Sequence, residues 1–201
     1  MSTRPRLRFM PVTPETWKDF ARLFGPRGAC AGCWCMWWRL PRSVFNEKKG
    51  DGNRRSMKKL VDSGVVPGIL AYEGDRAVGW CSIAPRDDFP ALDRSRVLAR
   101  VDDQPVWSMS CFFVARDRRR IGITAALIRE SVRFARANGA RIVEAYPVDP
   151  GEKGMADAFA FTGLASAFLK AGFVEAARRS PHRAVYRLAV NPGRRAARDA
   201  S

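Results

Sequence analysis

Val114-Ala-Arg-Asp-Arg-Arg-Arg-Ile-Gly-Ile-Thr-Ala-Ala-Leu-Ile128 is the stretch of sequence that decides the fold. Strand-forming residues 106–114 lead into it, a basic turn follows, and a helical pattern runs from Gly122 to about Asn138. The first N–H groups of a helix have no acceptor within the helix, and the helix dipole makes that end positive. This order of strand, turn and helix start therefore predicts a binding place for an anion such as a pyrophosphate.

The helix prediction rests on a 3.6-residue periodicity and on the stop signal Asn138-Gly139. Its apolar face consists of Thr124, Leu127, Ile128, Ser131, Val132 and Ala135. Gly122 has no side chain, so a ligand phosphate can approach its backbone closely. The spacing alone leaves a second interpretation open, which is an ordinary strand–turn–helix whose arginines face water.

The segment Arg119-Arg-Ile-Gly122-Ile-Thr124 resembles the coenzyme A pyrophosphate loop of the GNAT family of N-acetyltransferases. That loop reads Gln or Arg, two residues, Gly, one residue, then Gly or Ala. Thr124 departs from the pattern, and its β-branched side chain either narrows the phosphate cradle or adds a donor. The resemblance covers roughly residues 67–187, including Gly79-Trp-Cys-Ser-Ile-Ala-Pro85 as a family strand and Ala171-Gly-Phe173 as the late Gly-Phe signature.

The length of 201 residues suits one domain, expected over residues 1–190, with a flexible basic tail at 191–201. No apolar run is long enough to span a membrane, and the N-terminus lacks a signal-peptide core. We therefore expect a cytoplasmic protein without a membrane partner. The net charge of +16 raises nucleic acid as a partner. No nucleic-acid motif accompanies the scattered arginines, so a solvated basic surface is preferred to nucleic-acid binding.

The order of elements predicts an α/β fold with a mixed, mostly antiparallel central sheet and helices on both faces. A helix capped by Thr13-Pro14 should reach Leu23, residues 43–53 should be irregular, and residues 54–61 should be helical. A hairpin turn at 73–76 joins two strands. Residues 141–147 form a strand, 148–155 a loop, and Phe161–Lys170 a helix. The resemblance implies that strands 106–114 and 141–147 are parallel and splayed.

Cys30, Cys33 and Cys35 lie within an unusual segment that also carries Trp34, Trp37 and Trp38. A structural zinc site needs four ligands, and the sequence offers no second cysteine pair, so no metal is predicted. The thiols suit a small buried cluster. The three tryptophans lie at helical spacing and form either core or an aromatic wall at the acceptor site, which suits an apolar amine or a cation.

The resemblance implies that acetyl-CoA is the co-substrate and that backbone groups hold it in the splayed gap. The implied contacts are Phe112, Phe113, Val114, Arg119, Arg120, Ile121, Gly122, Ile123 and Thr124. The family often has a tyrosine as general acid where this chain has Phe168, which has no proton to donate. Glu144 and Tyr146 share a strand face, so Glu144 is the candidate general base and Tyr146 the candidate acid. Glu144 paired with an arginine, and Tyr146 in the core, are the alternatives.

These observations predict an acetyltransferase acting on a primary amine, which is either a small molecule or a peptide. The aromatic segment favours a small molecule. A non-catalytic module that binds acyl-CoA is the alternative, because Phe168 removes the expected acid. The sequence leaves open whether the chain is a monomer or a homodimer.

Overall fold

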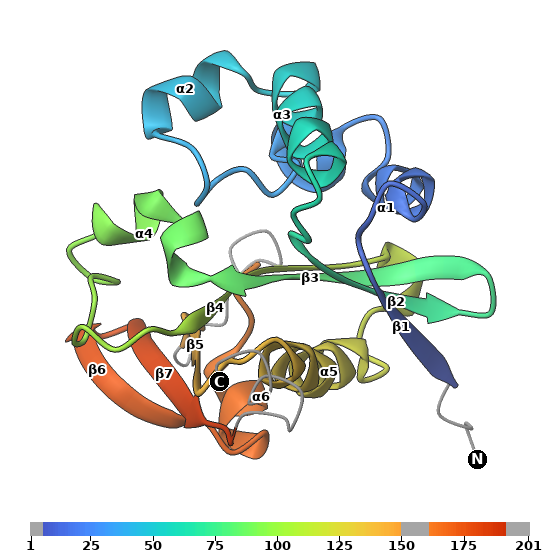
Figure 1. The fold of residues 1–201 in the computed structure, drawn as a ribbon. Helices are drawn as coiled ribbons and strands as arrows, with labels where there is room; N and C mark the ends of the chain where they lie inside the picture. Colours follow the sequence, from blue (N-terminus) through green and yellow to red (C-terminus); the bar gives the residue numbers. More distant parts are fainter. Residues whose placement is uncertain (1–5, 150–160, 192–201) are drawn as a thin grey trace, which may run out of the picture.

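The computed structural model describes residues 6–149 and 161–191, and its centre is one seven-stranded sheet (Figure 1). The strands are β1 (Leu7–Pro11), β2 (Gly68–Glu73), β3 (Arg76–Pro85), β4 (Trp107–Val114), β5 (Ile142–Ala145), β6 (Val174–Ser180) and β7 (Arg183–Ala189). They are arranged in the order β1-β2-β3-β4-β5-β7-β6. Only β4 and β5 pair in parallel, and the other neighbours are antiparallel. The predicted mixed, mostly antiparallel sheet is confirmed.

Helices cover both faces of this sheet, as predicted. They are α1 (Trp17–Phe24), α2 (Arg42–Glu47), α3 (Asp51–Asp62), α4 (Pro90–Asp93), α5 (Ile123–Ala137) and α6 (Ala165–Lys170). Figure 1 shows α1, α2 and α3 above the sheet and α5 and α6 below it. Within the described ranges, no helix has the length and apolarity needed to cross a membrane.

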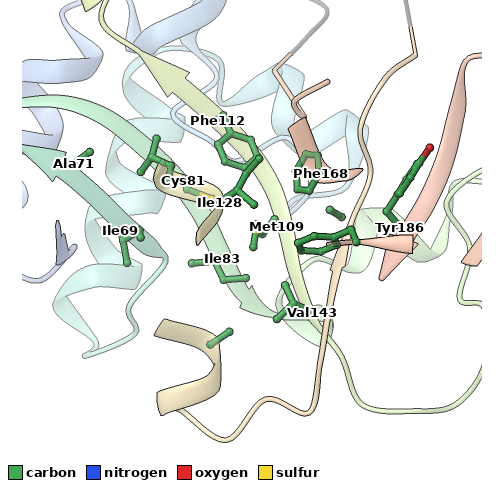
Figure 2. Packing of buried hydrophobic residues seen from close by; sticks show 14 of the residues in the cluster. Ile69, Ala71, Cys81, Ile83, Met109, Phe112, Ile128, Val143, Phe168 and Tyr186 are labelled. Carbon is green, nitrogen blue, oxygen red and sulfur yellow. The ribbon is translucent and has the colours of Figure 1, made fainter. Parts of the chain in front are cut away.

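Apolar side chains fill the space on each side of the sheet. Below it, α5 packs Leu127, Ile128 and Ala135 against strand residues such as Met109 and Val143. Thr124 and Val132, which the periodicity placed on the same face, are half-buried. Figure 2 shows this cluster, in which side chains from β2, β3, β4 and α6 meet. The opposite side is aromatic, with residues of α1 packed on β3.

The parallel pair β4–β5 is short. Its ladder joins Trp107 to Val143, Ser108 to Glu144 and Met109 to Ala145. β4 continues to Val114, whereas β5 ends at Ala145. The two strands therefore share a ladder at one end only, and the C-terminal half of β4 has no β5 partner.

Three predictions about local structure are wrong. Residues 43–53 are not irregular, because α2 and the start of α3 form there around the buried ring of Phe45. The predicted helix Phe161–Lys170 begins only at Ala165, since Phe161 O accepts from Phe112 N–H on β4 and Gly163 O accepts from Val148 N–H. The first helix begins at Trp17 rather than Pro14, because the Thr16 hydroxyl accepts a hydrogen bond from the N–H of Thr13 and so holds a turn. The basic tail and most of the predicted loop at 148–155 lie outside the described residues.

Candidate active site

The loop between β4 and α5 has the backbone geometry of an anion cradle. Gly122 caps α5 with φ of 90°, and Arg120 is also left-handed with φ of 65°. The first helical hydrogen bond runs from Ala126 N–H to Gly122 O, so the preceding amides of the first turn have no acceptor within the helix. No side chain caps this end. A Cβ atom on Gly122 would meet nothing within 4 Å, so the space in front of this backbone is open.

Side chains of the loop have different surroundings. Ile123 is buried beneath Gly79, so only its backbone can face a ligand. Arg118 pairs with Glu73, and Arg119 donates to the Val114 carbonyl. A groove of about 1080 Å³ borders the loop on the β1 side of α5, where Arg120, Gly122 and Arg129 are among its lining residues.

Beyond the parallel ladder, β4 and β5 no longer pair, and a gap separates the two strands. Backbone N–H groups of β4 point into this gap. Ala115 N–H donates to Val78 O on β3, whereas Phe112 N–H donates to Phe161 O at 2.6 Å. Because amide directions alternate along a strand, the N–H of Val114 points to the same side as that of Phe112. The segment Phe161–Leu164 therefore lies beside β4. On its other side lies Val148, just past β5, whose N–H donates to Gly163 O and whose carbonyl accepts from Ala165 N–H.

Glu144 and Tyr146, the predicted base and acid, lie together in a buried hydrogen-bond network. Arg86 Nη1 donates to Glu144 Oε1 at 2.5 Å and to Tyr146 Oη at 2.8 Å, and Arg187 Nε donates to Glu144 Oε2 at 2.8 Å. Tyr146 Oη donates to Glu144 Oε1 at 2.7 Å and lies 2.6 Å from Ser108 Oγ. The arrangement corresponds to the alternative in which arginines pair with Glu144.

Arg86 is the centre of this network, and each of its five N–H groups has an acceptor. In addition to Glu144 and Tyr146, the guanidinium donates to Asp93 Oδ1 from Nε and Nη2 and to Leu98 O from Nη2. Burial, followed by the charge of Glu144, raises the pKa of Tyr146 well above its ordinary value. The phenol is therefore neutral and protonated at physiological pH.

Comparisons with known proteins identify the family of the chain. The family model described as "Acetyltransferase (GNAT) family" matches residues 34–163. The chain belongs to the GNAT acetyltransferase family. No curated protein matches the sequence.

Solved structures of GNAT proteins share the fold at low sequence identity. One from Listeria monocytogenes has 10% identity and a TM-score of 0.59, with 94% of this chain and 98% of that chain covered. One from Streptococcus agalactiae has 11% identity and a TM-score of 0.54, covering 92% and 96%. A third, from Desulfovibrio desulfuricans, has 16% identity and a TM-score of 0.51, covering 92% and 99%. These likenesses bear on the fold only.

In this GNAT protein, Phe168 on α6 is fully buried against Phe112 and Phe173, with ring centroids 5.9 Å and 5.2 Å away (Figure 2). Its ring thus lies beside the β4 residue whose amide points into the gap. The side chain carries no proton, as the sequence indicated.

The three tryptophans of the cysteine segment do not form one wall, because residues 33–40 are turns rather than a helix. Trp34 is buried in the core between Trp17 and Phe24. Trp37 and Trp38 contact each other edge to face, and Trp37 is 36% exposed. The guanidinium of Arg42 lies 3.7 Å from the centroid of the Trp37 ring. A cation already covers one face of this ring.

The segment Cys35–Arg39 crosses the upper face of the sheet from β4 towards α4. Cys35 Sγ lies 3.1 Å from Cys111 Sγ on β4, and Trp38 O accepts from Ala91 N–H on α4. Trp38 also packs on the cluster that contains Tyr146. Among the described residues, no group of three or more His, Cys, Asp or Glu side chains could hold a metal ion.

Sequence reasoning missed two groups that define this site. Arg86 follows a strand as one arginine among many, and nothing in its local sequence indicated burial. Phe161 was assigned to a helix, although its carbonyl accepts from the Phe112 amide. Both interactions join residues that are far apart in the chain, so no local spacing could have revealed them.

Proposed function

We propose that the protein is an N-acetyltransferase that moves an acetyl group from acetyl-CoA to a primary amine of a small molecule. Family membership supports the acetyl transfer. The observation that carries the proposal is the combination of an uncapped, glycine-started helix with β4 amides that point into the adjacent gap. These are the two groups of donors that a linked pyrophosphate and thioester would need.

Bound acetyl-CoA supplies an activated acetyl thioester. Residues 119–124 contribute main-chain N–H groups and the positive end of the α5 dipole, which together favour two linked phosphates. The Phe112 amide donates towards the gap and suits a carbonyl oxygen on which negative charge develops. Its present acceptor is the Phe161 carbonyl. This hydrogen bond must therefore break when the thioester carbonyl binds in the gap.

Glu144 is proposed as the general base, with Tyr146 beside it. The carboxylate is held by two arginines and the phenol, so its orientation is fixed before an amine arrives. We expect Glu144→Gln to lower kcat/KM at least about tenfold and to shift its pH profile. Asp102→Asn is the control, because Asp102 pairs with the same Arg187 but lies at the surface. Equal activity of the Glu144→Gln and wild-type proteins would remove this role.

Trp37 and Trp38 are proposed to form the aromatic wall of the acceptor site, whereas Trp34 is a core residue. The edge-to-face pair and the packing of Trp38 on the cluster that contains Tyr146 support this assignment. Because Arg42 stacks on Trp37, the wall suits an apolar or aromatic body better than a second cation.

The second candidate is an acyl-CoA-binding module without transferase activity. Phe168 favours it, since the family's common acid is missing. Release of free thiol from acetyl-CoA in the presence of an amine panel separates the two functions. Coenzyme binding without thiol release would favour the module.

Coenzyme binding itself is tested by Gly122→Glu, with Gly64→Glu as the matched control. Both glycines have positive φ, and a Cβ atom at either would meet nothing within 4 Å. Strain and added charge are therefore similar, but only Gly122 lies in the phosphate loop. We expect calorimetry to show at least about tenfold weaker coenzyme binding, or roughly 1.4 kcal/mol, for Gly122→Glu only. Intact binding by that variant would contradict the proposal.

A further inference from the structure

The sulfur atoms of Cys35 and Cys111 lie against each other, although the two residues are 76 positions apart in the chain. Cys35 Sγ is 3.1 Å from Cys111 Sγ, a separation that is ordinary for N–H···O hydrogen bonds although sulfur is a larger atom. Both thiols are free in the structure. A disulfide has an S–S bond of about 2.0 Å, so the two sulfurs need to approach by about 1 Å to form one.

The backbone at Cys35 has an uncommon conformation. Trp34 and Cys35 have φ of 42° and 49°, in the left-handed region that residues with a Cβ atom seldom adopt. Such a conformation persists only where surrounding contacts hold it. The Cys35 sulfur contacts two strands, because Trp80 Nε1 on β3 donates to it at 3.0 Å and Cys111 lies on β4. The turn thus presents this sulfur to the sheet.

The two thiols differ in their access to solvent. Cys35 is 5% exposed, whereas Cys111 is partly exposed. Burial raises the pKa of the Cys35 thiol well above its ordinary value, so this thiol is protonated at neutral pH and donates to Cys111. That hydrogen bond lowers the pKa of Cys111, but burial and neighbouring thiols together raise it by more. Because the thiolate is the reactive form, Cys111 reacts slowly at neutral pH, and it is the thiol that a small oxidant reaches first.

We propose that Cys35 and Cys111 are a modification site, at which a peroxide joins the two thiols in a reversible disulfide. The Cys111 thiolate attacks one peroxide oxygen, the O–O bond breaks, and Cys111 becomes a sulfenic acid. The Cys35 sulfur then attacks the Cys111 sulfur, the S–O bond breaks, and water leaves. With hydrogen peroxide, two thiols and one peroxide give one disulfide and two waters, so the sulfurs are oxidised and the peroxide oxygens are reduced. This inference does not depend on the proposed acetyl transfer.

The disulfide ties the turn segment to the central sheet. A cross-link between residues 76 positions apart removes conformational freedom from the unfolded chain and so stabilises the folded one. The same segment carries Trp37 and Trp38, and Cys111 directly precedes Phe112 on β4. Oxidation therefore fixes the aromatic segment to the strand whose amide points into the gap.

The test treats the folded wild-type protein with hydrogen peroxide, blocks the remaining thiols with iodoacetamide, and maps disulfides by mass spectrometry of peptides that have not been reduced. We expect a Cys35–Cys111 peptide pair that dithiothreitol separates, and a Tm raised by at least about 4 °C. Cys35→Ser and Cys111→Ser should remove both effects. Cys30→Ser is the matched control, because it removes an exposed thiol close to Cys35 in the chain and should keep both effects.

Cys33 provides the competing outcome, because it lies two residues from Cys35. A Cys33–Cys35 bond, a bond to Cys30, or oxidation of Cys111 to a sulfinic acid without a bond to Cys35 would overturn the proposal, as would an unreacted Cys111. An unchanged Tm after the Cys35–Cys111 bond has formed would contradict the stabilising role. Because the mapping uses the wild-type protein, a serine variant that fails to fold does not affect it. Neither measurement requires acetyl transfer, so failure of the proposed function gives a different result.

Discussion

Replacing Arg86 by Met should destabilise the protein far more than the same substitution at a surface arginine. The Arg86 side chain is 2% exposed, and its partner Glu144 is fully buried. The substitution leaves Glu144 with Arg187 as its one remaining cation and removes a donor from Tyr146. Breaking a buried ion pair from one side costs about 3–5 kcal/mol, since a buried charge loses its partner.

Arg76 provides the matched control. It also pairs with a carboxylate, through two hydrogen bonds of 2.7 Å and 2.9 Å to Asp117, but both side chains are about half exposed. An exposed pair of this kind contributes little to stability, because water replaces either partner. Arg76→Met therefore tests the effect of removing a paired guanidinium without removing a buried one.

Urea and thermal unfolding of both variants measure the difference. For a domain of this length, about 3–5 kcal/mol corresponds to a Tm lower by roughly 6–20 °C, against at most a few degrees for Arg76→Met. The Tm of Arg86→Lys should lie between those of Arg86→Met and the wild type, since lysine keeps the charge but not the five donors. If Arg86→Met lowers the free energy of unfolding by no more than Arg76→Met does, the buried network around Arg86 does not stabilise the fold as its contacts indicate.

Two further predictions concern the acceptor and alkaline pH. Replacing Trp37 and Trp38 together by Ala should raise the acceptor KM and leave coenzyme affinity nearly unchanged in calorimetry; an unchanged KM would exclude the acceptor wall. Burial raises the pKa of Cys81 to about 12 in the folded protein, whereas an unfolded thiol ionises near about 8.5. The folded pKa is the higher one, so this contribution to stability is complete below about pH 8.5 and is lost as pH rises towards 12. At pH 10.5 the loss is about 2–3 kcal/mol, and the difference in unfolding free energy between wild type and Cys81→Ala should shrink by that amount from pH 7.5; a constant difference would contradict the burial argument.

Several features of the site were predictable because their causes are local. The strand before Val114, the glycine at the start of α5 and the periodicity of Leu127, Ile128 and Ala135 are read from consecutive residues. The hairpin at 73–76 follows from the same kind of signal. Such signals depend on backbone preferences and on side chains within one or two turns, so they are present in the sequence itself.

Other features depend on which distant residues meet. The tryptophan spacing suggested one helix face, yet Trp34 is in the core and Trp37 is at the surface, because the left-handed turn at Trp34 separates them. Most of residues 43–53 are helical, in α2 and at the start of α3, because the ring of Phe45 is buried, which the polar composition did not indicate. Tertiary packing overrode weak local preferences in both segments.

The sequence by itself determined the glycine turn at the start of α5, the order of elements and the pair Glu144 and Tyr146 on one strand face. Only the tertiary structure decided that Arg86 and Arg187 hold Glu144, that Phe161 accepts from the Phe112 amide, and that the sulfur atoms of Cys35 and Cys111 meet. The physical reason is that helix starts and strand alternation arise from neighbouring residues. Burial of charge and satisfaction of hydrogen bonds depend on residues that folding brings together from distant parts of the chain.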